Sequence, residues 1–507
     1  METSKSVSQR LEKSIGRIIQ AGYQIDAKTL QLLKELSSLG TIEDAVEHVI
    51  SEADNLHDKP LFVPYELLRT QNPAFEDSSV IGAAPISAPY SKQIESKMEI
   101  IVPSKVMASS GDIDDILAYF KDRFTRISAI LKQRSDARDS VPLAKALGGR
   151  EKEKTKVIVI VSDKREKKNA ILVEVEDADD HATLIVPSNT NKLAFEKAQR
   201  LFLDQVVCVE LTKVRKDLLV ASNFINPDIP ERPRVSGEDE VYAVLTSDIH
   251  VGSNKFLAEV FNRFLAWLRC HADDPEQRQI ASRVKYVIIA GDLVDGIGVY
   301  PNQDTELEIK DIQEQYSAVG KLFSQIPEHI EILIIPGNHD ATRQALPQPP
   351  IPEKFISAVE RHRKVWNLPN PTRVKLHGVE VLVNHGTSLN DVVGAIPEVT
   401  YQNLSETLPI AMRSLLKARH LAPRYGGRTP ILARNRDDLV IDVPPDVLHC
   451  GHVHVTSHDM YRGTLLVNSG AWQAQTSYQE RMGLSPTPGI VPVINLKDLS
   501  LRRLNFV

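Results

Sequence analysis

The chain has 507 residues, a formal net charge of −6 and three widely spaced cysteines, Cys208, Cys270 and Cys450. This length predicts two to four domains, and the acidic balance excludes a global attraction to nucleic acid, so that any such contact must be local. The cysteine spacing excludes a disulfide framework. No apolar stretch approaches the length of a membrane span, and we predict a cytoplasmic protein without a membrane partner.

Residues 1–57 are predicted to form a small helical unit. One helical face collects Leu11, Ile15, Ile18 and Ile19, a second collects Leu30, Leu32, Leu33 and Leu36, and a third collects Ala45, Val46, Val49 and Ile50. Thr41 and Asp44 form a capping box that opens the third helix. A bundle this short holds little core, so the unit is either an appended domain or a docking site for a partner.

The next two segments are predicted to connect this unit to the rest of the chain. Residues 58–110, rich in Ser, Pro and Ala from about residue 72, are expected to be a flexible linker. Residues 111–150 are expected to be a helical connector. Its apolar face contains Ile113, Ile116, Leu117, Phe120, Phe124, Ile127 and Leu131.

Residues 151–228 alternate between apolar runs and turns in a way typical of a small barrel. The predicted order is strands at 157–161, 170–175 and 183–187, a helix at 193–201, and strands at 206–211 and 217–221. This is the order of an oligonucleotide/oligosaccharide-binding (OB) fold. The basic segment 164–168 is expected to be its first loop, either a nucleic-acid contact or a solvated hairpin tip. Without an evident aromatic stripe, a structural or subunit-docking barrel is favoured.

Within residues 229–507, five apolar runs each end in a turn followed by Asp, Asn or His. They are Val241–Leu245 before Asp-x-His, Val287–Ala290 before Gly-Asp, Ile332–Ile335 before Pro-Gly-Asn-His-Asp, Val381–Val383 before Asn-His-Gly, and Val447–Leu448 before His-Cys-Gly-His-x-His. Buried strands of an open α/β fold deliver ligands in this way at their carboxyl ends. The sequence therefore predicts a multidomain α/β protein with a site at one sheet edge.

These motifs supply oxygen and imidazole donors. The candidate ligands are Asp248, His250, Asp292, Asn338, His385, His452 and His454. A structural zinc takes four ligands and usually includes thiolates, whereas this set suits two ions roughly 3.5–4 Å apart that share a carboxylate, as in phosphoester hydrolysis. Such ligands accept manganese, iron, zinc or nickel. Cys450, at the end of an apolar strand, is predicted to be a small buried residue and not a ligand.

A basic segment at 413–436 lies in the longest gap between the motifs. Its cations are Arg413, Lys417, Arg419, His420, Arg424, Arg428, Arg434 and Arg436, with no acidic residue among them. Such a run is a local footprint for a phosphate backbone, beside which Tyr401 and Tyr425 could stack on bases. The alternatives are a solvated face and a contact to a protein partner.

The five motifs resemble the signature blocks of the calcineurin-like metallophosphoesterases. The resemblance implies one metal held by Asp248, His250 and His454, another held by Asn338, His385 and His452, and a bridging Asp292. It implies two catalytic residues: His339 would stabilise the transition state and protonate the leaving oxygen, and Asp340 would orient His339 through a hydrogen bond. A turn-forming role is the alternative for Asp340. The implied domain, residues 229–507, is a four-layer β-sandwich with helices on both faces.

The order of the parts is similar to that of the small subunits of archaeal family-D DNA polymerases, over roughly residues 150–507. This resemblance implies a manganese-dependent 3′→5′ exonuclease that proofreads DNA 3′ ends for a separate large polymerase subunit, with magnesium, iron, zinc and nickel left open. One alternative is a stand-alone phosphatase or repair nuclease, which the upstream barrel disfavours. The other is a catalytically silent scaffold, which the complete ligand set disfavours.

Overall fold

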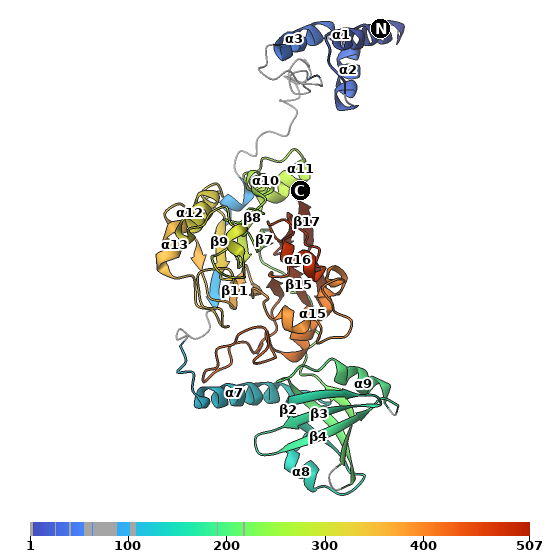
Figure 1. The fold of residues 1–507 in the computed structure, drawn as a ribbon, viewed down its shortest axis with the longest axis vertical. Coiled ribbons are helices and arrows are strands. Elements are labelled where there is room, and N and C mark those ends of the chain that lie inside the picture. The colour runs from blue at the N-terminus through green and yellow to red at the C-terminus, as the bar shows by residue number, and fades with distance from the viewer. Residues whose placement is uncertain are drawn as a thin grey trace. The chain divides into compact units, whose positions relative to one another are not determined.

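The computed structural model describes residues 4–25, 27–39, 42–54, 63, 89–101, 108–189, 191–215 and 218–507 (Figure 1). The chain divides into two compact units, Met1–Ala88 and Pro89–Val507. Among the described residues, none of the helices combines the length and hydropathy that a membrane span requires. The three cysteines are free.

The first unit is helical, as predicted. Its helices are α1 (Ser4–Gln20), α2 (Ala27–Leu39) and α3 (Ile42–Asp54). They share a core that includes Ile18, Leu33 and Val49. Ile19 is 61% exposed and does not join that core, because Ile18 takes the inward position of the same turn. The predicted capping box begins at Thr41, which lies outside the described residues.

The second unit begins with elements that the sequence analysis assigned to a linker. Helix α6 (Tyr90–Gln93) and strand β1 (Met98–Ile101) lie within the range 58–110. Strand β1 pairs antiparallel with β11 (Thr372–Leu376), with Met98 opposite Leu376. The linker prediction is therefore wrong for residues 89–101. Met98 and Ile100 pack on the core between the sheets, and this pairing partner lies too far along the chain for composition to reveal it.

A closed barrel follows, in the strand order β2-β3-β4-β6-β5. Its elements, with the helices that precede and interrupt it, are α7 (Ile113–Lys132), α8 (Leu143–Gly148), β2 (Lys154–Lys167), β3 (Ala170–Glu176), β4 (His181–Pro187), α9 (Lys192–Gln199), β5 (Val206–Arg215) and β6 (Leu218–Ile225). Alternate residues of each strand fill the interior, as Val157, Val159 and Val161 do in β2. The predicted order of strands and helix is confirmed.

The basic segment 164–168 is not the predicted loop, because β2 continues to Lys167 and pairs with β3. The Lys164 ammonium donates to the carbonyls of Gln199 and Leu201 at 2.6 and 2.8 Å, next to the carboxyl end of α9, where cations are favoured. Burial lowers the pKa of Lys164. The ammonium of Lys164 is thus bound by carbonyls of the barrel domain itself and does not extend from an open loop toward nucleic acid.

The remainder of the chain forms two six-stranded sheets. The first has the order β1-β11-β12-β13-β15-β14, with β12 (Val379–Val383), β13 (Val447–Cys450), β14 (Ser457–Tyr461) and β15 (Thr464–Asn468). The second has the order β10-β9-β8-β7-β16-β17, with β7 (Tyr242–Thr246), β8 (Val284–Ala290), β9 (Glu331–Ile335), β10 (Trp366–Asn367), β16 (Ile490–Asn495) and β17 (Leu501–Asn505).

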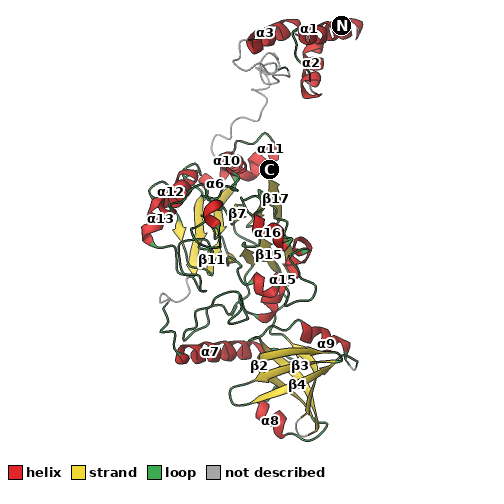
Figure 2. Ribbon diagram, in the orientation of Figure 1, coloured by secondary structure: helices red, strands yellow, loops and turns green. Residues whose placement is uncertain are grey.

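The two sheets share one core, to which Leu245, Ile288 and Leu333 contribute from one sheet and Val381 and Val447 from the other. Helices cover the opposite faces (Figure 2). They are α10 (Ala258–Leu268), α11 (Pro275–Ser282), α12 (Ile312–Phe323) and α13 (Glu353–Glu360) over the second sheet, and α14 (Leu389–Val392) and α15 (Leu404–Ala418) over the first. Because both faces are covered, central strands such as β8 are buried throughout.

A buried arginine on α7 joins the barrel to the segment between α15 and β13. The Arg123 guanidinium donates to the Asp437 carboxylate at 2.7 Å and to the carbonyls of Asp204 and Pro423 at 3.0 and 2.6 Å. A fourth bond, of 2.7 Å, goes to the Tyr119 hydroxyl. A buried charge needs this degree of pairing to be tolerated. Helix α7 is therefore anchored simultaneously to the barrel and to the sheet domain.

Most cations of the basic segment 413–436 are used inside the chain. Arg413 pairs with Asp459, His420 with Asp437, Arg434 with Asp438, and Arg436 with Asp438 and Asp442, while Arg419 donates to the carbonyls of Asp228, Ile441 and Asp442. Tyr425 packs against Tyr119 and Phe120 of α7. The carboxylate partners come from outside the segment, so its paired cations contribute less to a phosphate footprint than the run of charges in the sequence predicts.

Arg123→Met should lower the free energy of unfolding of the second unit by about 3–5 kcal/mol, since it leaves the buried Asp437 carboxylate without its guanidinium. Urea denaturation followed by circular dichroism measures the change. Arg138→Met, at an exposed position after α7, is the matched control and should alter stability by no more than about 0.5 kcal/mol. Equal stabilities of the two variants would contradict the anchoring role of Arg123.

Candidate metal centre

The candidate ligands follow the carboxyl ends of five strands. Strands β7, β8 and β9 are parallel neighbours in the second sheet, and β12 and β13 are parallel neighbours in the first. The loops after them carry Asp248 and His250, then Asp292, then Asn338, then His385, and then His452 and His454. Carboxyl ends of parallel strands meet at one edge, and two facing sheets bring both sets of loops to the same place.

The backbone at five of the seven candidate ligands is left-handed. The φ angles are 53° at Asp248, 55° at His250, 56° at Asp292, 70° at His452 and 57° at His454. A non-glycine residue in such a conformation costs on the order of 1–3 kcal/mol, and such residues cluster at functional sites. Gly337 packs so closely on Asp292 that an added Cβ would lie 2.1 Å from the Oδ1 atom and 2.6 Å from the backbone nitrogen of that residue. The loops are therefore shaped for side-chain placement at the expense of relaxed geometry.

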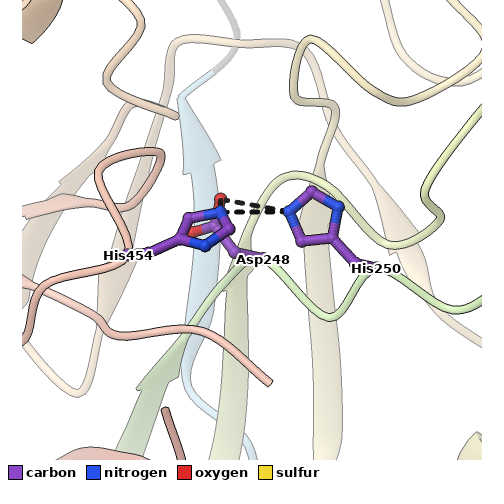
Figure 3. Close-up of side chains that lie close together, drawn as sticks. All are labelled: Asp248, His250 and His454. Carbon is purple, nitrogen blue, oxygen red and sulfur yellow. Dashed lines mark hydrogen bonds and ion pairs between the residues drawn. The ribbon is translucent and has the colours of Figure 1, made fainter. Parts of the chain in front are cut away.

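The first cluster contains Asp248, His250 and His454 (Figure 3). The Nε2 atoms of the two histidines are 3.1 Å apart. Asp248 Oδ1 lies 3.4 Å from His454 Nε2 and 4.0 Å from His250 Nε2. All three side chains are buried, so their donor atoms face one another across a gap of the size that a cation occupies.

The second cluster contains Asp292, His385 and His452. Asp292 Oδ2 lies 3.2 Å from His385 Nε2, and Asn338 Oδ1 lies 3.0 Å from the same nitrogen. Asp292 Oδ2 is also 3.9 Å from His250 Nε2 in the first cluster. The structure therefore brings all seven candidate ligands together, with Asp292 between the two clusters.

The donor set fits divalent cations. Asp248 Oδ1 is buried and has no hydrogen-bond partner, which is costly for a carboxylate unless a cation is present. Although burial opposes ionisation, His454 holds the pKa of Asp248 down at about 2. Burial also opposes a charge on His385, yet Asp292 raises its pKa to about 9. The site therefore carries negative potential that attracts cations.

Asp295 holds two of the site histidines, a role that none of the predicted ligand positions includes. Its carboxylate accepts from His250 Nδ1 at 3.1 Å, and its backbone carbonyl accepts from His339 Nδ1 at 2.7 Å. Gln303 and Gln473 fix the carboxylate at 3.0 Å each. A carboxylate behind a ligating histidine sets the tautomer and leaves Nε2 free for the metal. The only sequence signal was a second Asp shortly after Gly291-Asp292.

The predicted hydrogen bond between Asp340 and His339 is absent, and the Asp295 carbonyl takes that place. The Asp340 carboxylate instead accepts from the backbone amides of Asp292 and Gly337, at 2.8 Å each, and from the Tyr316 hydroxyl at 3.1 Å. Burial and the neighbouring Asp292 raise the pKa of Asp340 to about 7. Asp340 therefore fixes the loop after β9 against the loop after β8 and acts on the ligands through the backbone.

A pocket of about 280 Å³ opens over the ligands. Its floor includes His250, Asp292, Asn338, His339, His452 and His454, and its walls include Tyr300, Tyr401 and Tyr478. The pocket can thus admit a small phosphorylated group to the metal-binding side chains.

Cys450 is buried, as predicted, and burial raises the pKa of its thiol to about 12.

Comparisons with known proteins place this site in a class. Residues 243–458 match a family model that describes the B subunits of DNA polymerases alpha and epsilon. A DNA polymerase II small subunit from Methanothermobacter thermautotrophicus is 35% identical over 96% of this chain and 98% of the relative. The Methanocaldococcus jannaschii DNA polymerase II small subunit is 40% identical over 80% of this chain and 68% of the relative.

Solved structures offer weaker likenesses. An archaeal phosphodiesterase shares 13% identity with a TM-score of 0.25, over 52% of this chain and 99% of that one. The zinc complex of Vps29 from Entamoeba histolytica shares 14% identity with a TM-score of 0.25, over 53% of this chain and all of that one. Likenesses of this size support no conclusion about activity.

The family model thus matches the part of the chain that contains the candidate ligands. The relatives, matched over most of their length, show that the chain belongs to the family of archaeal DNA polymerase II small subunits. The resemblance to the small subunits of archaeal family-D polymerases is confirmed.

Asp295→Asn should weaken manganese binding about 10–100-fold, the usual loss when the carboxylate behind a metal-binding histidine is removed. Isothermal titration calorimetry of the full chain measures the affinity. Asp273→Asn, at an exposed position, is the control and should leave it unchanged. An unchanged affinity in Asp295→Asn would show that this carboxylate does not support His250.

Proposed function

We propose that the protein is a metal-dependent 3′→5′ exonuclease, the proofreading subunit of a two-subunit replicative DNA polymerase. The single observation that supports this most is the convergence of seven buried or half-buried His, Asp and Asn side chains in two adjacent clusters that share Asp292. A scaffold subunit has no use for two buried carboxylates and strained loops. Membership of the polymerase family supports a DNA strand as the substrate and a large polymerase subunit as the partner.

Two divalent ions, one held by Asp248, His250 and His454 and the other by Asn338, His385 and His452 with Asp292 between them, would activate the attacking water and neutralise the phosphate. Manganese is the metal we propose. Five of the ligands, on loops after the strands, line the pocket, so little reorganisation accompanies the reaction; they are His250, Asp292, Asn338, His452 and His454.

His339 has the geometry of a general acid. Its Nδ1 donates to the Asp295 carbonyl at 2.7 Å, and a carbonyl can only accept, so Nδ1 keeps its proton. Nε2 then faces the pocket, whose lining includes the half-buried His339. A protonated Nε2 donates to the departing 3′-oxygen and passes its proton to it as the phosphorus–oxygen bond breaks. Asp340 contributes by fixing the loop that carries His339.

The barrel and the sheets support the finer fold assignments. A closed barrel with a helix between its third and fourth strands has the order of an OB fold, and two packed sheets with helices on both outer faces suit a four-layer metallophosphoesterase sandwich. We assign residues 151–228 to the former and 229–507 to the latter. We also assign 1–57 to a helical unit, of which α1, α2 and α3 are described, and 111–150 to the connector that leads into the barrel.

The full chain with manganese should shorten a single strand labelled at its 5′ end one nucleotide at a time, and EDTA should abolish this activity. The label distinguishes the polarity, since attack from the 5′ end would release the labelled nucleotide at once. Release of the 5′ label, or no cleavage with any divalent metal, would contradict the exonuclease assignment.

His339→Ala should lower kcat about 10²–10⁴-fold, the usual loss for a general acid, while manganese content stays that of the wild type. Asp292→Asn should lose metal instead, measured by elemental analysis after dialysis. His271→Ala, at an exposed position between α10 and α11, is the matched control. Wild-type turnover in His339→Ala would overturn its role.

A further inference from the structure

The pocket over the ligands is small compared with a DNA strand. Its volume of about 280 Å³ lies just below the range of about 300–1,000 Å³ that is usual for ligand pockets. It therefore has room for about one nucleotide, and the rest of a polynucleotide must lie on the rim. The side chains at the rim then decide whether a strand is preferred to a small phosphate ester.

One arginine at the rim is tied to a metal ligand through a chain of hydrogen bonds. Arg428 Nη1 donates to the Tyr401 hydroxyl at 3.1 Å, and that hydroxyl donates to Asn390 Oδ1 at 2.9 Å. The Asn390 amide nitrogen donates to His452 Nε2 at 2.7 Å. Tyr401, Asn390 and His452 all line the pocket, so the Arg428 guanidinium stands at its edge.

The loop that carries Arg428 is fixed. The backbone amides of Arg428 and Thr429 donate to the Asp391 carboxylate of α14 at 2.7 and 3.0 Å. Gly427 lies against the same carboxylate, since an added Cβ would be 2.4 Å from Asp391 Oδ1. Helix α14 also carries Asn390, so the arginine and the pocket wall are held by one element.

Arg428 also differs from the paired arginines of the segment 413–436 in having no carboxylate partner among the described residues. It is exposed, and no carboxylate in the described part of the chain forms an ion pair with it, whereas Arg413, Arg434 and Arg436 are paired. A guanidinium with free N–H groups binds a phosphate through two parallel hydrogen bonds. Arg428 is therefore a fixed cation that is available to an anion beside the pocket.

An aromatic ring lies at the same rim. Tyr478, on α16 (Ser477–Met482), is 57% exposed and lines the pocket together with Tyr401. An exposed ring beside a phosphate-binding cation is the combination that proteins use to hold single strands.

We propose that Arg428 and Tyr478 form a strand-binding subsite, in which Arg428 binds the phosphate next to the scissile one and Tyr478 stacks on a base. The inference rests on the proposed function and specifies its substrate as a single-stranded polynucleotide of at least two phosphates. A phosphomonoester or a diester without a second phosphate gains nothing from this subsite. The preference for strands therefore resides in residues that do not contact the metals.

The test compares two substrates in the presence of manganese: an oligothymidylate, and bis(p-nitrophenyl) phosphate, which has no second phosphate. Arg428→Gln should raise KM for the oligonucleotide about tenfold, the loss expected for one charged phosphate contact. An equal loss of kcat/KM for the small diester would contradict the subsite, because Arg428 would then act through its hydrogen-bond link to His452. Tyr478→Ala should raise the same KM, and Tyr478→Phe should restore it, because stacking needs the ring and not the hydroxyl. Arg361→Gln, an exposed arginine just after α13, is the matched control.

Binding supplies a readout that does not depend on turnover. The affinity for a fluorescein-labelled oligothymidylate is measured in EDTA at several salt concentrations, and log affinity is plotted against log salt. In Arg428→Gln the magnitude of the slope should be smaller by about 0.7, the value for one phosphate contact on a single strand. Equal slopes and equal KM values for Arg428→Gln and Arg361→Gln would overturn the subsite. Failure of the wild type to cut DNA would instead overturn the exonuclease, and the binding slopes would then decide the subsite alone.

Discussion

The structure depends on the placement of two buried carboxylates, Asp248 and Asp292, among imidazoles at the edge where two sheets meet. Burying such charges is unfavourable unless cations compensate them. Histidines supply part of that compensation, as the raised pKa of His385 shows. The buried Asp248 oxygen without a hydrogen-bond partner marks what remains for a metal. The strained loops, the amide contacts of Asp340 and the support from Asp295 all serve to keep these charges in place.

The site was predictable from sequence because each motif is local. A buried strand, a turn and a ligand occupy about ten residues, and the parallel strands bring the five motifs together without further information. The residues that form hydrogen bonds to the ligand histidines were not predictable in the same way. Asn390 and Gln479 come from segments without a pattern, and their contacts to His452 and His454 span 62 and 25 residues.

Long-range pairing accounts for the errors in the fold. Strand β1 looked like linker because its partner, β11, lies some 270 residues further on, and Arg123 meets Asp437 across 314 residues. The same kind of pairing changes the meaning of the basic segment 413–436. Seen in sequence it contains no acidic residue, yet Asp437, Asp438 and Asp442 follow it directly, Asp459 lies further on, and together they pair with Arg413, His420, Arg434 and Arg436. Arg428, which is hydrogen-bonded to Tyr401 of the pocket, has no such carboxylate partner among the described residues.

The left-handed backbone at five of the ligands has an evolutionary consequence. Each of these residues opposes folding, and a glycine in its place would relax the loop at no steric cost. A copy of the protein released from hydrolysis would therefore gain stability once the buried carboxylates and the histidines that compensate them were lost together, while the sheets and the barrel stayed intact. Decay of the reaction centre into a purely architectural subunit is thus an energetically downhill path that begins from this fold.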